Sequence, residues 1–276
     1  MELNYREMGE GEPLIILHGL YGSSDNWMNI ARELAGSYRV FLPDQRNHGH
    51  SPHSETHTYE AMREDLREFM DRLQLSGAHI LGHSMGGKTA IYFAAAYPGR
   101  VKKLIVVDIG PSAYPQLTGS SATALSHLNI TQALYNLDTD NVHTLREADQ
   151  QLAEAIPYLQ VRQFLLKNLK KNKQTGRYQW LLNIGAIRNE LPNIMDGLDP
   201  ERYSGDTAIR SMPVLFIRGE RSPYIDDRQA DDIRTVFPQA RIESIEDAGH
   251  WVHAEKRKPF LKLVNHFLEQ EPTVNP

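Results

Sequence analysis

The segment His79-Ile80-Leu81-Gly82-His83-Ser84-Met85-Gly86-Gly87 decides how this sequence is interpreted. A short apolar run leads directly into the pattern Gly-x-Ser-x-Gly, and a helical run follows. The pattern alone occurs by chance in roughly one chain in ten of this length, where it is a simple glycine-rich turn. Between a strand and a helix, however, it forms the strained turn that exposes a serine hydroxyl above a sheet. We therefore expect Ser84 to be a nucleophile.

Short apolar runs bounded by Gly, Pro or Asp lie on both sides of this segment, at residues 14–17, 40–42, 104–107 and 213–217. Runs this short and continuous are typical of strands buried on both faces, as in a parallel sheet. Between them, apolar residues recur every three or four positions, which indicates helices that pack on a sheet. The alternation predicts an α/β fold with a mostly parallel sheet flanked by helices.

The alternation stops between residues 111 and 210, where the spacing predicts helices over 122–137, 142–156, 158–169 and 179–189. It returns with a strand at 213–217, a helix over 227–237, a strand over 241–245 and a closing helix over 259–268. We expect one α/β core built from residues 1–110 and 211–276. Residues 111–210 would form a helical cap inserted after the strand that carries Asp108.

Composition narrows the function classes. The chain has 276 residues, enough for one large or two small domains, and it has no cysteine, which excludes disulfides, a thiolate nucleophile and Cys-ligated metals. A net charge of −5 argues against a nucleic-acid partner. The longest apolar run, 90–97, is shorter than the ~20 residues of a membrane span, and the first residues do not resemble a signal peptide. We expect a soluble, cytoplasmic protein without a membrane span.

A serine needs a base within hydrogen-bond reach to act as a nucleophile. His250 follows the last predicted strand, in a loop at the carboxyl end of the sheet, where ligands bind in open α/β folds. His253 is the alternative, and we expect it to be structural. The sequence therefore predicts His250 as the base.

Two places could supply the acid that orients this histidine. Many proteins of this architecture carry it in a Gly-x-x-Asp turn, but here the turn beginning at Gly219 has Ser222 in that position. Asp226 and Asp227 follow closely, yet they precede a helix and are typical of N-caps. Asp108 lies at the end of the strand next to the one that carries Ser84. We predict Asp108 as the acid, with Asp226 or Asp227 as alternatives.

Acyl transfer also needs donors for the developing oxyanion, and each is worth about 10²–10³ in rate. One is expected to be the backbone N–H of Met85, the residue after the nucleophile. The other is expected from the loop His18-Gly19-Leu20-Tyr21-Gly22, which follows the strand at 14–17. Its glycines allow a tight turn, and we predict the N–H of Leu20 as the second donor.

Together these residues resemble the α/β-hydrolase superfamily and, within it, the small bacterial YbfF-type esterases and their mitochondrial abhydrolase relatives. The strings that carry the resemblance are His18-Gly19-Leu20-Tyr21-Gly22-Ser23, Asp25-Asn26-Trp27, Arg46-Asn47-His48-Gly49, the serine motif extended to Lys88, and Gly249-His250-Trp251-Val252-His253-Ala254-Glu255-Lys256. The resemblance spans nearly the whole chain. It implies a serine esterase with an acid at Asp108, a helical cap and no cofactor.

The expected substrate is a small-molecule carboxylic ester with a small or medium acyl chain, cleaved through an acyl-serine intermediate. An acyl-coenzyme A thioesterase and a catalytically silent ligand receptor on the same fold are the alternatives, and the oligomeric state stays open. We expect Tyr21, Trp180 and Trp251 to bind substrate. Aromatic residues of the insertion such as Tyr114 and Phe164 are divided between pocket and core in a way that the sequence does not decide.

Two further clusters of residues, one of histidines and one of basic side chains, could bind a metal or a charged substrate. The histidines at 48, 50, 53 and 57 lack the carboxylate of the His-x-His-x-Asp-His metal site and lie in a Pro/Ser/Thr-rich loop, so we expect no metal. A basic stretch contains Lys167, Lys170, Lys171, Lys173 and Arg177. It is typical of a solvated helix end, and the alternative is long-range attraction of an anionic substrate.

Overall fold

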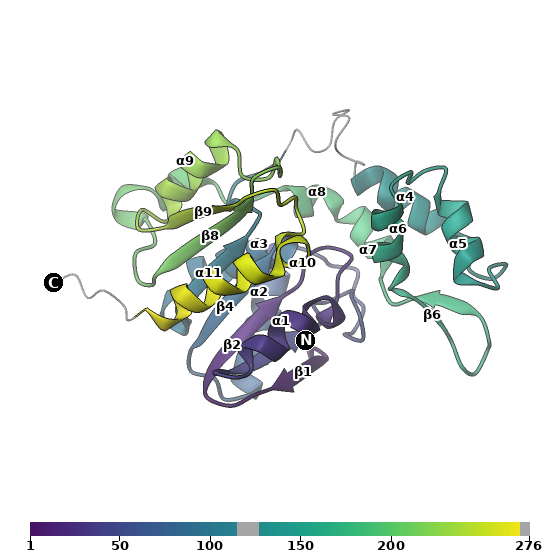
Figure 1. Cartoon of the computed structure of the whole chain (residues 1–276), viewed down its shortest axis with the longest axis horizontal. Coiled ribbons are helices and arrows are strands. Elements are labelled where there is room, and N and C mark those ends of the chain that lie inside the picture. The colour runs from purple at the N-terminus through teal and green to yellow at the C-terminus, as the bar shows by residue number, and fades with distance from the viewer. Residues whose placement is uncertain (115–126, 271–276) are drawn as a thin grey trace.

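The computed structural model describes residues 1–114 and 127–270. A seven-stranded sheet lies at its centre, in the order β1-β3-β2-β4-β5-β8-β9 (Figure 1). Its strands are β1 (Tyr5–Met8), β2 (Glu12–Leu17), β3 (Tyr38–Pro43), β4 (Ala78–His83), β5 (Val101–Val107), β8 (Val214–Gly219) and β9 (Arg241–Ile245). Only β1 pairs in the antiparallel sense among these strands. The predicted α/β fold with a mostly parallel sheet is confirmed.

Helices cover both faces of the sheet because successive side chains of each buried strand point to opposite sides. Ile15 and Leu17 belong to one apolar cluster, with α2 (Tyr59–Arg72), α3 (Met85–Ala96) and α9 (Asp227–Val236). Leu14 and Ile16 belong to the other cluster, with α1 (Met28–Leu34) and α11 (Arg257–Glu269). The continuous apolar runs in the sequence are therefore strands buried on both faces.

The register of the parallel strands brings their carboxyl ends to one edge. Gly82 of β4 lies opposite Leu17 of β2 and Val106 of β5, and Val107 lies opposite Ile217 of β8. The loops after β2, β4, β5, β8 and β9 therefore meet at the same edge. This is the edge where ligands bind in open α/β sheets.

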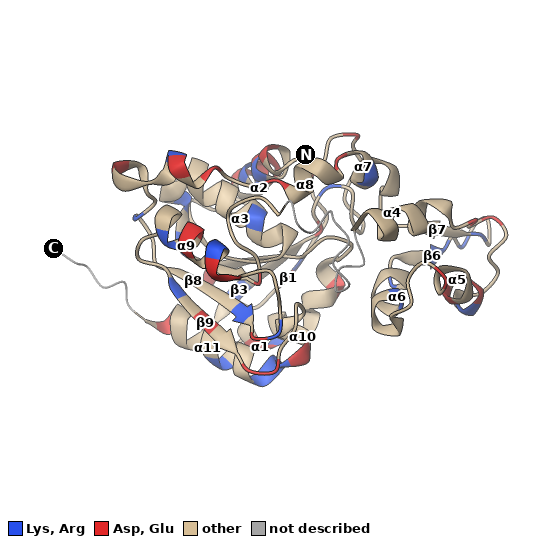
Figure 2. Cartoon of the chain, turned by 90° about the horizontal axis from the view of Figure 1, so that it is seen from above, with Lys and Arg blue, Asp and Glu red and all other residues tan. Residues whose placement is uncertain are grey.

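Between β5 and β8 the chain leaves the sheet and forms a smaller lobe, which we call the insertion (Figures 1 and 2). Its main elements are α4 (His127–Asn136), α5 (Leu145–Leu152), α6 (Leu159–Leu166), β6 (Leu169–Lys171), β7 (Tyr178–Trp180), α7 (Ile184–Asn189) and α8 (Leu191–Met195). Short 3-10 turns, Pro200–Tyr203 and Gly205–Thr207, lead back toward β8. The first part of the helix predicted over 122–137 lies outside the described residues.

One prediction for the insertion is wrong. Gln179, placed in a helix by the sequence analysis, lies in β7, which pairs with β6 in an antiparallel hairpin. Each strand has only three residues, so their apolar spacing is too short to distinguish a strand from a helix. The turn signal was present at Gly176, whose φ of 71° is the left-handed conformation that glycine adopts readily.

Both connections to the insertion are held at one point by Lys88 of α3. Its buried ammonium donates to the carbonyl of Ser112 at 2.8 Å and to that of Asp196, and it lies 4.8 Å from the centre of the Tyr114 ring. Burial lowers the pKa of Lys88 to about 7. Ser112 precedes the insertion helices and Asp196 follows them, so this side chain joins both crossings to the helix that begins after Ser84.

No helix in the described parts of the chain is long and apolar enough to cross a bilayer.

Candidate active site

Ser84 stands in the turn between β4 and α3, with φ 53° and ψ −122°. A side chain at either flanking glycine would be blocked. A Cβ at Gly82 would lie 2.2 Å from the carbonyl oxygen of Gly86, and a Cβ at Gly86 would lie 2.4 Å from that of Leu17. The two glycines therefore let β2, β4 and α3 approach closely enough to form the strained turn.

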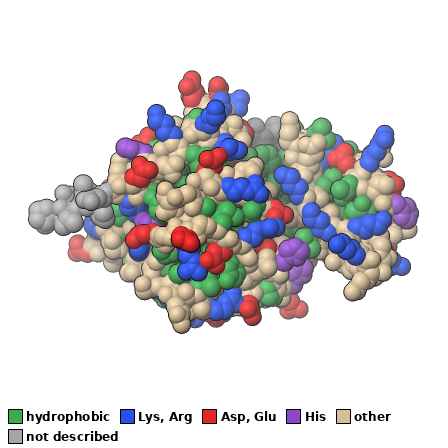
Figure 3. Space-filling view, turned by 60° about the horizontal axis from the view of Figure 1, so that its bottom comes forward, with side chains coloured by type: hydrophobic (Ala, Val, Ile, Leu, Met, Phe, Trp, Pro, Cys, Tyr) green, Lys and Arg blue, Asp and Glu red, His purple; other side chains and the backbone are tan. Residues whose placement is uncertain are grey.

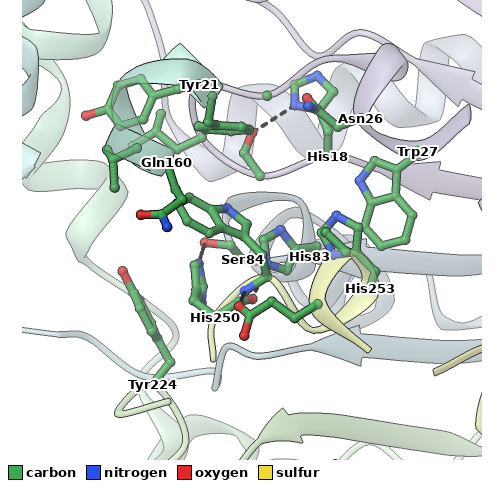
Figure 4. A pocket seen from close by; sticks show the side chains of 18 of the residues that line it. His18, Tyr21, Asn26, Trp27, His83, Ser84, Gln160, Tyr224, His250 and His253 are labelled. Carbon is green, nitrogen blue, oxygen red and sulfur yellow. Dashed lines mark hydrogen bonds between the residues drawn. The ribbon is translucent and has the colours of Figure 1, made fainter. Parts of the chain in front are cut away.

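His250 and Asp108 complete a hydrogen-bonded chain with this serine. Figure 4 shows the Ser84 and His250 part of this chain. The Ser84 hydroxyl donates to Nε2 of His250 at 3.1 Å. On the other side of the ring, Nδ1 donates to Oδ2 of Asp108 at 2.7 Å. The three side chains come from the loops after β4, β5 and β9, and Asp108 is completely buried.

The Asp108 carboxylate is held by two further donors. Oδ1 accepts the backbone N–H of Gly219 at 3.0 Å, and Oδ2 accepts the hydroxyl of Ser222. Both donors belong to the turn after β8 where many proteins of this architecture carry their acid. A serine hydroxyl in this position cannot stabilise a charged histidine as a carboxylate does. In the structure the Ser222 hydroxyl instead donates a hydrogen bond to the Asp108 carboxylate at the end of the neighbouring strand.

The alternative acid and the alternative base have other contacts. Oδ1 of Asp226 accepts the N–H of Gln229 at 2.8 Å and so caps α9, while Asp227 lies in the first turn of that helix. The ring of His253 stacks on Trp27, with centroids 4.0 Å apart and planes 13° from parallel. Burial lowers the pKa of His253 to about 3. It is therefore neutral in the fold near pH 7.

Aromatic side chains pack directly around His250, and the sequence analysis missed two of them. Tyr224 stacks on the His250 ring at a centroid distance of 4.1 Å. His83 donates from Nε2 to the carbonyl of His250 at 2.9 Å, and burial keeps its pKa well below 6.5. His83 lies in the serine motif itself, whereas no pattern in the sequence distinguished Tyr224. Both contacts restrict the orientation of the His250 ring.

The predicted oxyanion donors come from two elements next to Ser84, the start of α3 and the loop after β2. Met85 is the first residue of α3, whose leading N–H groups have no partner within the helix. Leu20 lies in a tight turn closed by the N–H of Gly22, which donates to the carbonyl of Gly19 at 2.9 Å. A Cβ on Gly19 would lie 3.2 Å from Cβ of Ser84. This turn therefore packs directly against the nucleophile.

A cavity of about 1,700 Å³ opens over these residues, between the sheet edge and the insertion. Ser84, His250, Tyr21, Trp251 and Tyr224 are among its lining residues (Figure 4). The insertion contributes a wall of mixed apolar and polar side chains, namely His127, Ile130, Tyr158, Gln160, Val161, Gln163, Phe164, Leu165 and Lys167. A concave site that combines apolar and aromatic side chains with a few polar groups is typical of small-molecule binding.

Trp180 is the predicted substrate-binding residue that the structure does not bring to this cavity. It lies in β7, packs against the apolar cluster of the insertion and is absent from the described residues that line the cavity. Tyr114 is also buried elsewhere, with its hydroxyl on the carbonyl of Tyr224. Phe164 does reach the cavity, 5.4 Å from the ring of Trp251. The sequence placed these aromatics in the insertion without showing which face each occupies.

The histidine-rich loop has its own hydrogen bonds. His48 and His57 are buried with ring centroids 5.4 Å apart, and within the described ranges no group of three or more His, Asp or Glu side chains is placed to hold a metal ion. The predicted basic stretch forms the β6–β7 hairpin and its approach. Lys and Arg side chains are frequent over this lobe in Figure 3, and Lys167 lines the cavity.

Residues 12–257 match the family described as the alpha/beta hydrolase fold. This chain belongs to that family. The sn-1-specific diacylglycerol lipase ABHD11 of Xenopus laevis is 38% identical over 263 residues, which cover 94% of this chain and 80% of that protein. Esterase YbfF of Escherichia coli is 32% identical over 273 residues, covering 97% and 99%. A solved marine microorganism esterase is 45% identical, with a TM-score of 0.90 and coverage of 96% and 99%.

As an α/β hydrolase, the chain thus stands among esterases and lipases, and it is similar to both the bacterial and the ABHD11 groups over nearly its full length. This agrees with the resemblance drawn from its motifs.

Proposed function

We propose that this α/β hydrolase is a serine esterase that cleaves small-molecule carboxylic esters with small or medium acyl chains. The observation that carries the proposal is the continuous chain of hydrogen bonds from Asp108 through His250 to Ser84. A buried carboxylate on Nδ1 fixes the tautomer in which Nε2 accepts the serine proton. Ser84 is then the nucleophile, His250 the general base and Asp108 the orienting acid.

The reaction would proceed in two halves. Oγ of Ser84 attacks the acyl carbonyl while its proton moves to Nε2 of His250, and the N–H groups of Leu20 and Met85 receive the oxyanion. As the tetrahedral intermediate collapses, His250 returns the proton to the leaving alkoxide and an acyl-serine forms. Water then attacks the acyl-serine while its proton moves to the same Nε2. As the second tetrahedral intermediate collapses, His250 returns that proton to Oγ of Ser84 and the acid is released. Asp108 does not take the proton in either half, and its carboxylate keeps the hydrogen bonds from Gly219 and Ser222.

The division of the chain follows from this assignment. Residues 1–110 and 211–276 would form the catalytic core, and residues 111–210 would be the cap that shapes the acyl site. Tyr21 and Trp251 line the cavity from the core side and Phe164 from the insertion side, which supports an apolar acyl site between the two. Trp180 is left out of this assignment.

A fluorophosphonate probe tests the proposal directly, because it phosphonylates a serine only when that serine is activated. We expect a mass increase on the peptide that contains Ser84, turnover of p-nitrophenyl esters, and loss of both in Ser84→Ala. Comparison of acetyl, butyryl, octanoyl and palmitoyl esters then gives the acyl preference. A folded wild-type protein with neither labelling nor turnover would support the silent receptor instead.

One observation favours the thioesterase alternative. Lys167, Arg221 and Lys258 are among the residues that line the cavity, where their charges would attract the phosphates of a coenzyme A leaving group. For this function, kcat/KM on an acyl-coenzyme A ester should fall steeply with added salt, while that on a neutral ester stays nearly constant. Equal salt dependence for the two substrates would favour the simple esterase.

A further inference from the structure

The turn that carries Leu20 contains a strained residue. The hydrogen bond from Gly22 to Gly19 closes the turn and uses neither the N–H of Leu20 nor that of Tyr21. Tyr21, the third residue of the turn, has φ 60°, a position that such turns usually give to Gly or Asn. A residue with a Cβ holds this conformation at a cost of about 1–2 kcal/mol. The Tyr21 peptide groups therefore need support from their surroundings.

Two buried side chains provide that support. The N–H of Tyr21 donates to Nε2 of His48 at 3.1 Å, and the carbonyl of Tyr21 accepts Nδ2 of Asn168 at 2.7 Å. His48 donates from Nδ1 to the carbonyl of Arg46, so its Nε2 carries the lone pair that Tyr21 requires. His48 and Asn168 are both buried. Both polar groups of the strained residue are thus held.

The two supports belong to different lobes. His48 lies in the core loop after β3, whereas Asn168 lies in the insertion between α6 and β6. Asn168 is fixed within the insertion, because its backbone carbonyl accepts the N–H of Leu181 at 2.8 Å and its Nδ2 also reaches the carbonyl of Leu165. The amide of Asn168 therefore links the insertion to the backbone of the turn, while the Tyr21 hydroxyl donates to the His127 carbonyl of α4 at 3.4 Å.

We propose that Asn168 is a positioning residue that couples the seating of the insertion to the oxyanion donor at Leu20. With the insertion seated, Asn168 and His48 hold the Tyr21 peptide units and so aim the adjacent Leu20 N–H at the site above Ser84. When the insertion is displaced, the Tyr21 carbonyl loses its donor and the strained turn relaxes. Ester cleavage then depends on the lobes being closed. The inference rests on the proposed esterase function.

The test compares Asn168→Ala and Asn168→Asp with Asn172→Ala. The aspartate keeps the size of the side chain but loses the donor. Asn172 lies four residues further along the insertion, in the turn of the β6–β7 hairpin, and is half-buried. Its side chain hydrogen-bonds within that hairpin, to Gln174, Thr175 and Gln179, so its variant is the matched control. Kinetics on p-nitrophenyl butyrate are measured together with inhibition by a trifluoromethyl ketone, which forms a tetrahedral oxyanion on the serine, and with the melting temperature.

We expect both Asn168 variants to lower kcat by about 10- to 100-fold, part of the effect of one oxyanion donor, with KM changed less than about threefold. Affinity for the trifluoromethyl ketone should fall in parallel with kcat, while Asn172→Ala stays at wild-type values. The reason is that the donor acts on the tetrahedral state and not on the bound ester.

Wild-type kcat and ketone affinity in folded Asn168→Asp would overturn the inference. So would a rise in KM alone, since that is the result of a merely loosened pocket wall. Failure of the proposed function has a different signature: the wild-type protein itself would neither turn over the ester nor react with a fluorophosphonate, and the inference would fall with it.

Discussion

The core and the insertion differ in how their structure positions the side chains around the cavity. In the core, Ser84 and Asp108 come directly after strands, and His250 lies in the loop after β9, all at the same edge of the sheet. The strands themselves are buried on both faces. In the insertion the elements are short. The large apolar side chains that are exposed in the described parts of the chain all lie there, namely Leu128, Tyr135, Leu145, Tyr158 and Leu159. The sheet thus positions the candidate catalytic residues, while the short elements of the insertion form the opposite wall of the cavity.

If this division is correct, the largest effect comes from the acid on the sheet edge. Asp108→Asn should lower kcat by about 10⁴-fold, because the amide no longer stabilises the charged His250 and favours the wrong tautomer. Steady-state kinetics on a p-nitrophenyl ester measure the effect.

Asp226→Asn is the control for this comparison. It keeps an oxygen that caps α9 and should change kcat by less than about twofold and stability by less than about 1 kcal/mol. The reverse pattern, with Asp226 essential and Asp108 dispensable, would contradict the assignment.

The second prediction concerns acid sensitivity of the core. Burial lowers the pKa of His253 to about 3, from an ordinary value of 6.5. Above pH 6.5 both states are unprotonated, so the full stability is present. As the pH falls from 6.5 toward 3, the unfolded chain binds a proton that the folded core excludes. A histidine of this kind then lowers the free energy of unfolding by about 1.4 kcal/mol per pH unit, which amounts to about 2 kcal/mol at pH 5.

Urea unfolding at pH 7 and pH 5 checks this for His253→Phe, in which the new ring can still stack on Trp27. The loss of unfolding free energy between the two pH values should be smaller than in the wild type by about 2 kcal/mol. His143→Asn, at an exposed position in the insertion, is the control. Identical pH dependence in wild type and His253→Phe would show that this ring does not titrate as described.

A smaller effect is expected from Ser222. Removal of its hydroxyl takes one donor from the Asp108 carboxylate but leaves Gly219 in place. Ser222→Ala should therefore lower kcat by about tenfold, in the range of one hydrogen bond to a charged group. Ser204→Ala, at an exposed 3-10 turn, should leave kcat unchanged. A loss as large as that in Asp108→Asn would mean that Ser222 has a more direct role.

The smallest effect distinguishes two tryptophans. Trp180→Ala should leave kcat/KM within about twofold and lower the unfolding free energy by about 1–2 kcal/mol, because the ring packs inside the insertion. Trp251→Ala should raise KM several-fold, because that ring lines the cavity. Kinetics and thermal unfolding on the same preparations separate the two effects. Equal changes in KM would show that Trp180 reaches the substrate after all.

The α/β fold of the core and its candidate catalytic residues could be predicted from the sequence, because the motifs that indicate them are local and several of them agree. The serine motif, the strand-end position of Asp108 and the loop containing His250 each identify one corner of the same constellation. The insertion lacked such signals: three-residue strands carry almost no period, and the orientation of Trp180 depends on a hairpin partner. Tyr224 and Asn168 were missed for a related reason. Their roles exist only through contacts with His250 and Tyr21, which lie 26 and 147 residues away in the sequence.

Lys88 joins both chain connections of the insertion at one point. This point acts as a pivot when the contacts of the insertion with the core loops, such as Asn168 with Tyr21 and Asn183 with Asn47, are released. The two crossings are also bonded to each other, from Leu198 to Pro111 and from Tyr114 to Met195, each at 2.9 Å. A lobe on one stalk behaves as a lever: a small change of angle at the stalk moves the far hairpin most and Ser84, one helical turn from Lys88, least. The displacement caused by a substitution near the pivot is therefore largest at the far contacts of the lobe and smallest at Ser84.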